Sequence, residues 1–288
     1  MIEFLSVVMP AYNEEAAIEN VVLEHMRVLE TMASSVPRWE IVVVDDGSKD
    51  RTPDVLRSLR ARVSQLRVVR QENRGIFGAV TRAYGEARGS HIYSTGSDGQ
   101  WPASNLPKMT EALQNGADLV IGVRSNRHEV YSASRRFVSF CFNRIAELVF
   151  GVPVRDAGSV KLGRREVFRM RLISRSPFFE AERIVRAQRA GFRIGFVPIL
   201  FGQRNGGRST AVSWKNVRGS VLDMARFAVS AGLWRQEQPA SELFEKMAAV
   251  PHVVEREGRS DGHDAIDAAA LHGEREGAEL GFVEAEHR

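Results

Sequence analysis

The chain has 288 residues, 43% of them hydrophobic, and it holds 40 Lys or Arg against 36 Asp or Glu. This length and apolar content are enough for one α/β domain with a full hydrophobic core. A single cysteine excludes an intramolecular disulfide, and no apolar run approaches the ~18 residues that a membrane-spanning helix needs. The amino terminus shows no basic segment followed by an apolar run, so no signal peptide is expected and the predicted location is cytoplasmic.

The charge is distributed unevenly along the chain. Residues 235–288 contain 6 Lys or Arg and 13 Asp or Glu, a net charge of −7, whereas residues 1–234 contain 34 and 23, a net charge of +11. A basic body suits anionic ligands such as diphosphates, lipid phosphates or an anionic membrane surface, although basic residues also occur on any solvated surface. Nucleic acid is disfavoured because the basic residues are scattered and no aromatic stripe is interleaved with them. The acidic tail is predicted to be largely disordered.

Strands and helices alternate through the first third of the chain. Apolar runs predict strands at 4–9, 40–44, 66–70 and 91–95, and helical periodicity predicts helices at about 14–31, 52–59 and 78–87. Pro53, directly after Thr52, marks the start of the second helix because proline is tolerated in a first helical turn. Alternation at this spacing predicts an α/β fold with a doubly wound, mainly parallel sheet flanked by helices.

Two further helices are expected after these elements. Residues 128–150 are mostly apolar, which suits a core helix as well as a helix that faces an acceptor or a membrane. Residues 214–234 have an apolar side with Trp214 and Trp234 at the two ends, and cations such as Arg218 on the polar side. Such a helix can lie in a membrane interface, and it can equally pack on the domain or on a second subunit.

Acidic and amide side chains follow three of the predicted strands where each strand ends. The ligand crevice of an open α/β sheet lies beyond the carboxyl ends of its strands, so we expect one shared polar site. The residues are Pro10, Ala11, Tyr12, Asn13 and Glu14 after the first strand, Asp45 and Asp46 after the second, and Asp98 in Ser97-Asp98-Gly99-Gln100. Helix capping by Asn13 and a tight turn at Asp46-Gly47-Ser48 are alternatives that need no ligand.

The order and spacing of these segments resemble the nucleotide-sugar-binding half of family-2 glycosyltransferases of the GT-A type. Within that family the chain looks most like the dolichol- or polyprenyl-phosphate sugar synthases. The resemblance covers about residues 4–210. It extends to Asn73-Arg74-Gly75 with Gly78 and Ala79, to Gly85 and Gly89, to Arg124 after Val120-Ile121-Gly122, to Asp156-Ala157-Gly158-Ser159, and to Arg204 with Gly207 and Ser209. No single motif is specific, whereas the ordered set is.

The resemblance implies a nucleotide-sugar site at the strand ends and at Gly75. It also implies a divalent cation, Mg²⁺ or Mn²⁺, which neutralises the leaving diphosphate and takes Asp98 and Gln100 as ligands. The metal motif of the family usually reads Asp-x-Asp-x-Gln, and Gly96 stands here in place of the first Asp. This difference leaves several alternatives, which are weaker metal binding, a different metal preference, a donor held mainly by basic residues, and loss of activity.

The resemblance also implies basic residues beside the donor and acceptor phosphates, where the planar guanidinium of arginine suits phosphate oxygens. A lipid monophosphate is already anionic near neutral pH and needs positioning, whereas a hydroxyl acceptor needs a general base. Asp156 is the first candidate base, and Glu180 and Glu182 are others that also suit the first turn of a helix. The residues expected at the acceptor and phosphates are Arg124, Ser159, Arg204, Arg208 and Ser209, with Arg208 near the position of a family lysine.

The sequence therefore predicts an inverting glycosyltransferase that moves a sugar from a nucleoside-diphosphate sugar to a polyprenyl monophosphate, with Asp98, Asp156 and Arg124 as catalytic residues. Transfer to a hydroxyl of a soluble small molecule or glycan is one alternative. A catalytically silent nucleotide-sugar-binding protein, suggested by Gly96, is another. The expected organisation is a catalytic domain at 1–210, an amphipathic helix at 211–234 and the acidic tail at 235–288. Peripheral association with the inner face of the cell membrane and self-association both stay open.

Overall fold

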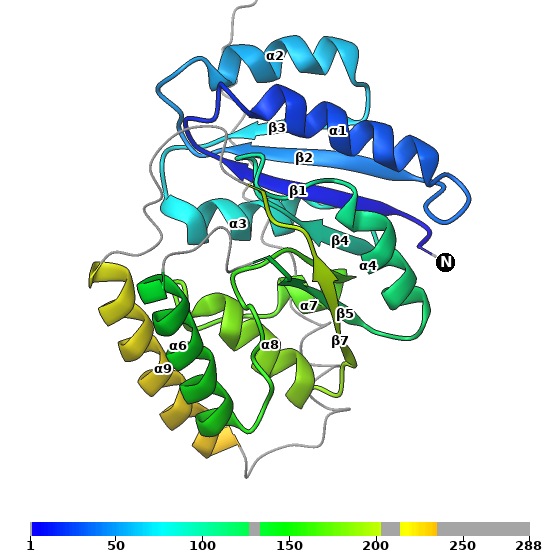
Figure 1. Ribbon diagram of the computed structural model, residues 1–288. Helices are drawn as coiled ribbons and strands as arrows, with labels where there is room; N and C mark the ends of the chain where they lie inside the picture. Colours follow the sequence, from blue (N-terminus) through cyan, green and yellow to red (C-terminus); the bar gives the residue numbers. More distant parts are fainter. Residues whose placement is uncertain (1, 127–132, 203–213, 235–288) are drawn as a thin grey trace, which may run out of the picture. The chain divides into compact units, whose positions relative to one another are not determined.

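The computed structural model describes residues 2–126, 133–202 and 214–234, and its centre is a seven-stranded sheet (Figure 1). The order across the sheet is β3-β2-β1-β4-β6-β5-β7, and only β6, which runs antiparallel to β4 and β5, departs from the parallel direction among the described strands. The strands are β1 (Leu5–Ala11), β2 (Trp39–Asp45), β3 (Leu66–Arg70), β4 (His91–Ser94), β5 (Leu119–Arg124), β6 (Lys161–Arg164) and β7 (Ile194–Ile199). The predicted mixed α/β fold with a mainly parallel sheet is confirmed.

The predicted helices are present, most with shifted ends, and the helices at 105–114 and 165–169 were not predicted. They are α1 (Ile18–Thr31), α2 (Thr52–Arg62), α3 (Gly75–Glu86), α4 (Asn105–Gln114), α6 (Ala133–Phe150), α7 (Arg165–Arg169), α8 (Phe179–Arg189) and α9 (Trp214–Trp234). α2 begins at Thr52 as predicted, whereas α1 begins at Ile18 and not near Glu14. Before this helix the backbone N–H of Glu14 donates to Thr52 Oγ1 at 2.8 Å, which ties the segment to the residue that begins α2.

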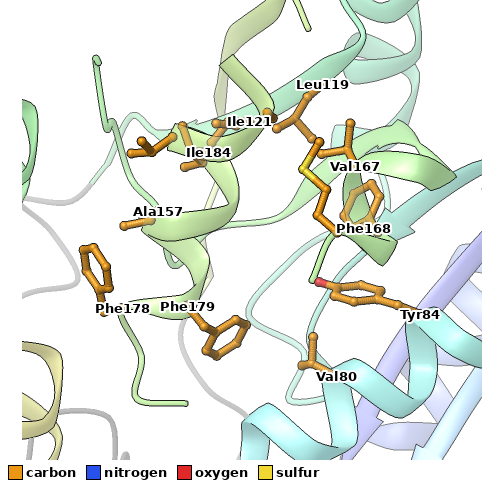
Figure 2. Packing of buried hydrophobic residues seen from close by; sticks show 14 of the residues in the cluster. Val80, Tyr84, Leu119, Ile121, Ala157, Val167, Phe168, Phe178, Phe179 and Ile184 are labelled. Atoms are coloured by element: carbon orange, nitrogen blue, oxygen red, sulfur yellow. The ribbon is translucent and has the colours of Figure 1, made fainter. Parts of the chain in front are cut away.

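Both faces of the sheet are buried, which explains its continuous apolar runs. Val7 and Val43 belong to a core cluster shared with α1, α2 and α4, whereas Val8 and Val42 point to the opposite face and join a cluster with α3, α6, α7, α8 and α9. Figure 2 shows the second cluster, where side chains of α3, α7 and α8 meet those of β5. The alternation along each strand is the one expected from the two-residue repeat of a β-strand.

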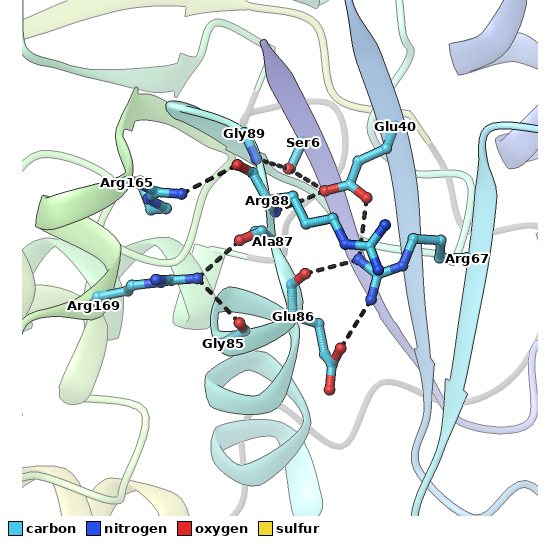
Figure 3. Close-up of polar contacts among 10 residues, drawn as sticks. All are labelled: Ser6, Glu40, Arg67, Gly85, Glu86, Ala87, Arg88, Gly89, Arg165 and Arg169. Atoms are coloured by element: carbon cyan, nitrogen blue, oxygen red, sulfur yellow. Dashed lines mark hydrogen bonds and ion pairs between the residues drawn. The ribbon is translucent and has the colours of Figure 1, made fainter. Parts of the chain in front are cut away.

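A buried polar network holds the amino-terminal edge of β1 and β2 (Figure 3). Glu40, 5% exposed, accepts from Ser6 Oγ at 2.7 Å and from the Arg67 guanidinium at 3.1 Å. The N–H of Gly89 donates to the same Ser6 hydroxyl at 2.8 Å. A Cβ at Gly89 would lie 2.7 Å from Phe4 O, so this glycine of the family pattern is needed for close backbone approach.

Helix α9 packs with one face on the domain, beside α6 (Figure 1). Phe227 is 2% exposed, and its ring centroid lies 5.0 Å from that of Phe150 on α6. Asp223 accepts the backbone N–H groups of Arg175 and Ser176 at 3.0 and 2.9 Å. Of the three roles predicted for residues 214–234, packing on the domain is therefore observed for this face.

Within the described part of the chain, no helix combines the length and apolarity that crossing a bilayer requires. All described residues belong to one unit, Met1–Ala249. The predicted tail at 235–288 lies outside the described residues. The predicted domain boundary at 210 lies outside them as well, and both stay predictions.

Candidate active site

The carboxyl ends of β1 and β2 lie side by side and hold a buried carboxylate. Ala11 and Asp45 are register partners, and the N–H of Asp46 donates to Ala11 O at 2.9 Å. Asp45 is 1% exposed, accepts the N–H of Ser48 at 2.9 Å, and lies 3.4 Å from Arg70 Nε. The structure thus brings the first two strand ends together, as predicted.

Asn13 ties this edge to the facing loop and does not cap a helix. Its φ is 57°, its Oδ1 accepts the N–H of Lys49 at 2.8 Å, and its own N–H donates to Ser48 Oγ at 3.0 Å. Since α1 begins only at Ile18, the helix-capping alternative for Asn13 is wrong. The neighbouring Tyr12 is 42% exposed, so its ring is accessible to a ligand at this edge.

Asp46 connects the end of β2 to the loop that precedes α3. Its Oδ1 accepts Gln71 Nε2 at 2.7 Å and the N–H of Arg74 at 2.8 Å, directly before Gly75 begins the helix. Gly47 has a φ of 73°, and a Cβ there would lie 2.9 Å from a backbone nitrogen of this loop. The segment is therefore a constrained turn that requires glycine. Contact of Asp46 and Gly75 with a nucleotide stays a prediction.

The segment after β4 lies between the ends of β1 and β7. Ser97 Oγ donates to Pro10 O at 2.7 Å, and the N–H of Gly202 donates to Gln100 O at 2.8 Å. Gln100 Nε2 donates back to Gly202 O at 3.3 Å, and Asp98 Oδ1 accepts the N–H of Gln100 at 3.1 Å. Asp98 is therefore held at the same edge as the ends of β1 and β2.

Trp101 covers the position of the missing first carboxylate. A Cβ at Gly96 would lie 3.0 Å from Trp101 Cδ1 and 3.2 Å from its Nε1. The φ of Gly96 lies outside the left-handed region, so the indole and not the backbone restricts this position. The Trp101 ring also packs on Phe201 with centroids 4.5 Å apart, which leaves it little freedom to move.

Asp98 and Gln100 carry side-chain oxygens of the kind that a hard divalent cation binds. Within residues 2–126, 133–202 and 214–234 no group of three His, Cys, Asp or Glu could hold a metal. Mg²⁺, however, is often bound by one or two carboxylates together with waters and substrate phosphates. The carboxylate of Asp98 and the side-chain oxygen of Gln100 suit such a cation, whose other ligands would come from a diphosphate and water.

Arg124 and Asp156 form a buried, multiply bonded ion pair beside this segment. Arg124 Nε lies 2.9 Å from both carboxylate oxygens of Asp156, its Nη2 donates to Oδ1, and its backbone N–H donates to Oδ2 at 2.9 Å. The side chains are 10% and 0% exposed. The guanidinium also lies 5.4 Å from the ring of Trp101 and 5.2 Å from that of Phe201. Arg124 is therefore held by Asp156 and by the two aromatic rings, one of which, Trp101, follows the Asp98 segment.

The other two candidate bases also have partners. Glu180, whose side chain is 15% exposed, lies 2.8 Å from Lys161 Nζ. Glu182 is fully buried, accepts the N–H of Ser174 at 2.8 Å, and pairs with Arg186 at 2.6 Å. Both glutamates lie in the first turn of α8, as the helix-start alternative predicted. Glu182 therefore has a structural role.

The predicted phosphate-binding residues divide into two groups. Ser159 is 7% exposed, and its hydroxyl is buried with no hydrogen-bond partner among the residues that the structure describes. Arg204, Arg208 and Ser209 lie outside the described residues, so their expected role stays a prediction. Sequence reasoning did not select Lys161 or Phe201. The signal for Lys161 was a lone cation in the otherwise apolar Val160-Lys161-Leu162.

A cavity of about 370 Å³ lies at the opposite edge of the sheet from these residues. It is lined at the amino-terminal ends of β4, β5 and β7 by His91, Asp118 and Arg193, and Arg164 joins them from the end of β6. Asp118 pairs with Arg164 at 3.0 Å and with Arg193 at 3.7 Å. This cavity is therefore separate from the candidate active site.

A family model described as "Glycosyl transferase family 2" matches residues 6–171, more than half of the chain. The chain belongs to this family. Among its relatives in glycosyl transferase family 2 is a dolichyl-phosphate hexose transferase of Haloferax volcanii, 32% identical over 204 residues, which are 70% of this chain and 84% of the relative. An undecaprenyl-phosphate 4-deoxy-4-formamido-L-arabinose transferase of Pseudomonas paraeruginosa is 34% identical over 160 residues, which are 54% of this chain and 45% of that protein. The chain thus matches less than half the length of this second relative.

Solved structures support the fold. Glucosyl-3-phosphoglycerate synthase of Mycobacterium tuberculosis, in complex with Mn²⁺, UDP-glucose and phosphoglyceric acid, matches with a TM-score of 0.59 at 19% identity. The match covers 78% of this chain and 80% of the synthase. At this identity the likeness establishes the GT-A type fold alone.

Proposed function

We propose that this chain is an inverting glycosyltransferase that transfers a sugar from a nucleoside-diphosphate sugar to a polyprenyl monophosphate. Membership of glycosyl transferase family 2 supports the sugar transfer. The names of two relatives, one acting on dolichyl phosphate and one on undecaprenyl phosphate, support the acceptor class. The first of these relatives is matched over 84% of its length. A match of this extent favours a reaction common to both proteins, and not only one domain in common.

The observation that most favours a phosphate acceptor is that all three candidate bases are held in ion pairs or hydrogen bonds within the protein. Asp156 accepts from Arg124 with both oxygens, Glu180 pairs with Lys161, and Glu182 accepts from the backbone and from Arg186. Each carboxylate is therefore already engaged by a cation of the protein, and its oxygens are not directed at an acceptor hydroxyl. A phosphate monoester, with a second pKa of about 6, needs no such base near neutral pH. A hydroxyl acceptor would need one.

Some residues of the site would then bind the donor, and others would bind the acceptor. Asp98 and Gln100 would hold the cation that neutralises the departing diphosphate. Arg124, which lies beside the Asp98 segment, would contribute its positive charge to holding the acceptor phosphate. An acceptor phosphate oxygen forms the new bond to the anomeric carbon while the bond from that carbon to the diphosphate breaks, and the configuration inverts. No covalent enzyme intermediate is needed.

A membrane-facing surface on α6 and α9 would bring the protein to a lipid acceptor. Leu148 on α6 is 81% exposed, and Trp214 and Val229 on α9 are 89% and 70% exposed. Arg226 on α9 and Arg144 on α6 have side chains that are 74% and 60% exposed. Exposed apolar residues next to cations suit an anionic membrane interface. We expect binding to vesicles with anionic lipid that is stronger than binding to neutral vesicles, weakened by salt and reduced by Trp214→Ala.

The proposal is tested by incubating the purified protein with Mg²⁺ or Mn²⁺ and a panel of labelled nucleotide sugars, with and without polyprenyl phosphate. The expected result is label in the lipid extract with one donor, lost in Arg124→Ala. Efficient transfer to a water-soluble alcohol with no lipid product would favour the hydroxyl-acceptor alternative. Donor binding with neither transfer nor hydrolysis would favour the silent binder.

A further inference from the structure

Lys161 is a buried cation at the start of β6, next to the candidate site. It is 1% exposed, and its Nζ lies 2.5 Å from Ala157 O, 3.0 Å from Ser159 O and 2.8 Å from Glu180 Oε2. An ammonium group has three donors, and these three partners use all of them. Burial lowers the pKa of Lys161 and the Glu180 carboxylate raises it, so the ion pair offsets part of the cost of burying the charge.

The loop that Lys161 contacts is the one that presents Asp156 to Arg124. Asp156 has a φ of 52°, a left-handed conformation that is strained for a non-glycine residue and therefore needs support from its surroundings. Its carbonyl accepts the N–H of Ser159 at 2.9 Å, which closes a short turn. Lys161 binds the carbonyls of Ala157 and Ser159 in that same turn.

The other partner of Lys161 anchors the turn to a rigid element. Glu180 lies in the first turn of α8, whose neighbouring Phe179 is 2% exposed and packs edge-on against Phe77 of α3, with ring centroids 5.2 Å apart. Ala157 itself lies in the hydrophobic cluster beside α8 (Figure 2). A shift of α8 or loss of the Lys161 ammonium would therefore change the conformation of the turn that holds Asp156.

We propose that Lys161, braced by Glu180, is a positioning residue that fixes the 156–159 turn and thereby the orientation of Arg124 in the site. Lys161 is too buried to touch a substrate, so it acts through Asp156 and Arg124. The effect on acceptor use rests on the proposed function, because Arg124 is there assigned to the acceptor phosphate. The effect on the turn itself does not rest on it.

The test compares wild type with the double variant Lys161→Met/Glu180→Gln, which removes both charges and so avoids a buried unpaired carboxylate. The matched control is Arg67→Met/Glu40→Gln, which removes an ion pair of 3.1 Å at the opposite edge of the sheet. Peptide-level amide hydrogen exchange at residues 156–160, nucleoside-diphosphate affinity, and kcat and KM for polyprenyl phosphate are measured for each protein.

We expect the Lys161 variant to exchange faster at 156–160, to bind nucleoside diphosphate as wild type does, and to lose about 10- to 100-fold in kcat/KM for the acceptor. The control should lose thermal stability without either change. Unaltered exchange at 156–160 together with wild-type acceptor kinetics would overturn the proposal. So would an equal kinetic loss in the control, because that would reflect general destabilisation.

Two outcomes separate this proposal from the proposed function. If wild type transfers no sugar, the proposed function fails, and exchange at 156–160 alone decides whether Lys161 fixes the turn. If the double variant does not fold, the single variant Glu180→Gln is measured in its place, because its amide oxygen can still accept a hydrogen bond from Lys161. Faster exchange at 156–160 in Glu180→Gln supports the proposal, and unchanged exchange there overturns it.

Discussion

Replacement of Phe227 by Ala should undock α9 and destabilise the whole domain. Phe227 is 2% exposed, its ring centroid lies 5.0 Å from that of Phe150 and 6.1 Å from that of Phe178, and the guanidinium of Arg186 lies over it at 5.0 Å. Burial on this scale makes a Phe→Ala change cost about 3–5 kcal/mol. For a domain of this size, about 2–4 °C of Tm per kcal/mol gives an expected decrease of roughly 6–20 °C.

The measurement is thermal unfolding followed by circular dichroism, with Val229→Ala on the same helix as the control. Val229 is 70% exposed, so its truncation should change the Tm by no more than about 2 °C. A Phe227→Ala protein that melts within that range of wild type would refute the docking of α9. It would also restore the view that this helix is held only by a membrane or by a second subunit.

Three further predictions concern the metal site, the core and the backbone. Asp98→Asn should reduce turnover about 10²- to 10³-fold, and unchanged turnover, or full wild-type activity in excess chelator, would contradict the cation site. Burial lowers the pKa of His25 from 6.5, so the unfolded chain takes up a proton first as the pH falls. Stability should decrease below pH 6.5 by up to about 1.4 kcal/mol per pH unit, and less so in His25→Phe; equal slopes in urea titrations would contradict this. Gly89→Ala should cost about 1–3 kcal/mol because its Cβ would meet backbone atoms at 2.7 Å, whereas Gly85→Ala, with nothing within 4 Å, should be tolerated; equal midpoints in urea would contradict the close approach.

The strands β1 to β4 could be predicted from the sequence, whereas β5, β6 and β7 were not predicted. Apolar runs with polar residues at their ends gave β1 to β4, because buried parallel strands are continuous and apolar. β6 spans only Lys161–Arg164 and contains a lysine and a glycine, so its local pattern does not indicate a strand. It forms by antiparallel pairing with β4 and β5, which are distant in sequence.

The candidate site was predicted where residues follow strand ends and missed where partners are distant. Asp98 and Arg124 lie at strand ends, and topology alone brings them to one edge of the sheet. The pairing of Lys161 with Glu180 joins β6 to α8, and no local pattern encodes it. The same holds for α9, where Phe227 is buried and Val229 is exposed although both are apolar.

The central claim is that the acceptor atom is a phosphate oxygen, and the most direct test compares two lipids that differ only there. Polyprenyl monophosphate and the free polyprenol of the same chain length are offered separately with the active donor and Mg²⁺. The candidate bases are all paired with other groups of the protein, so none is placed to deprotonate an alcohol. We therefore predict transfer to the phosphate, and transfer to the alcohol that is at least about 100-fold slower. Glycosylation of the polyprenol at a comparable rate would contradict the account.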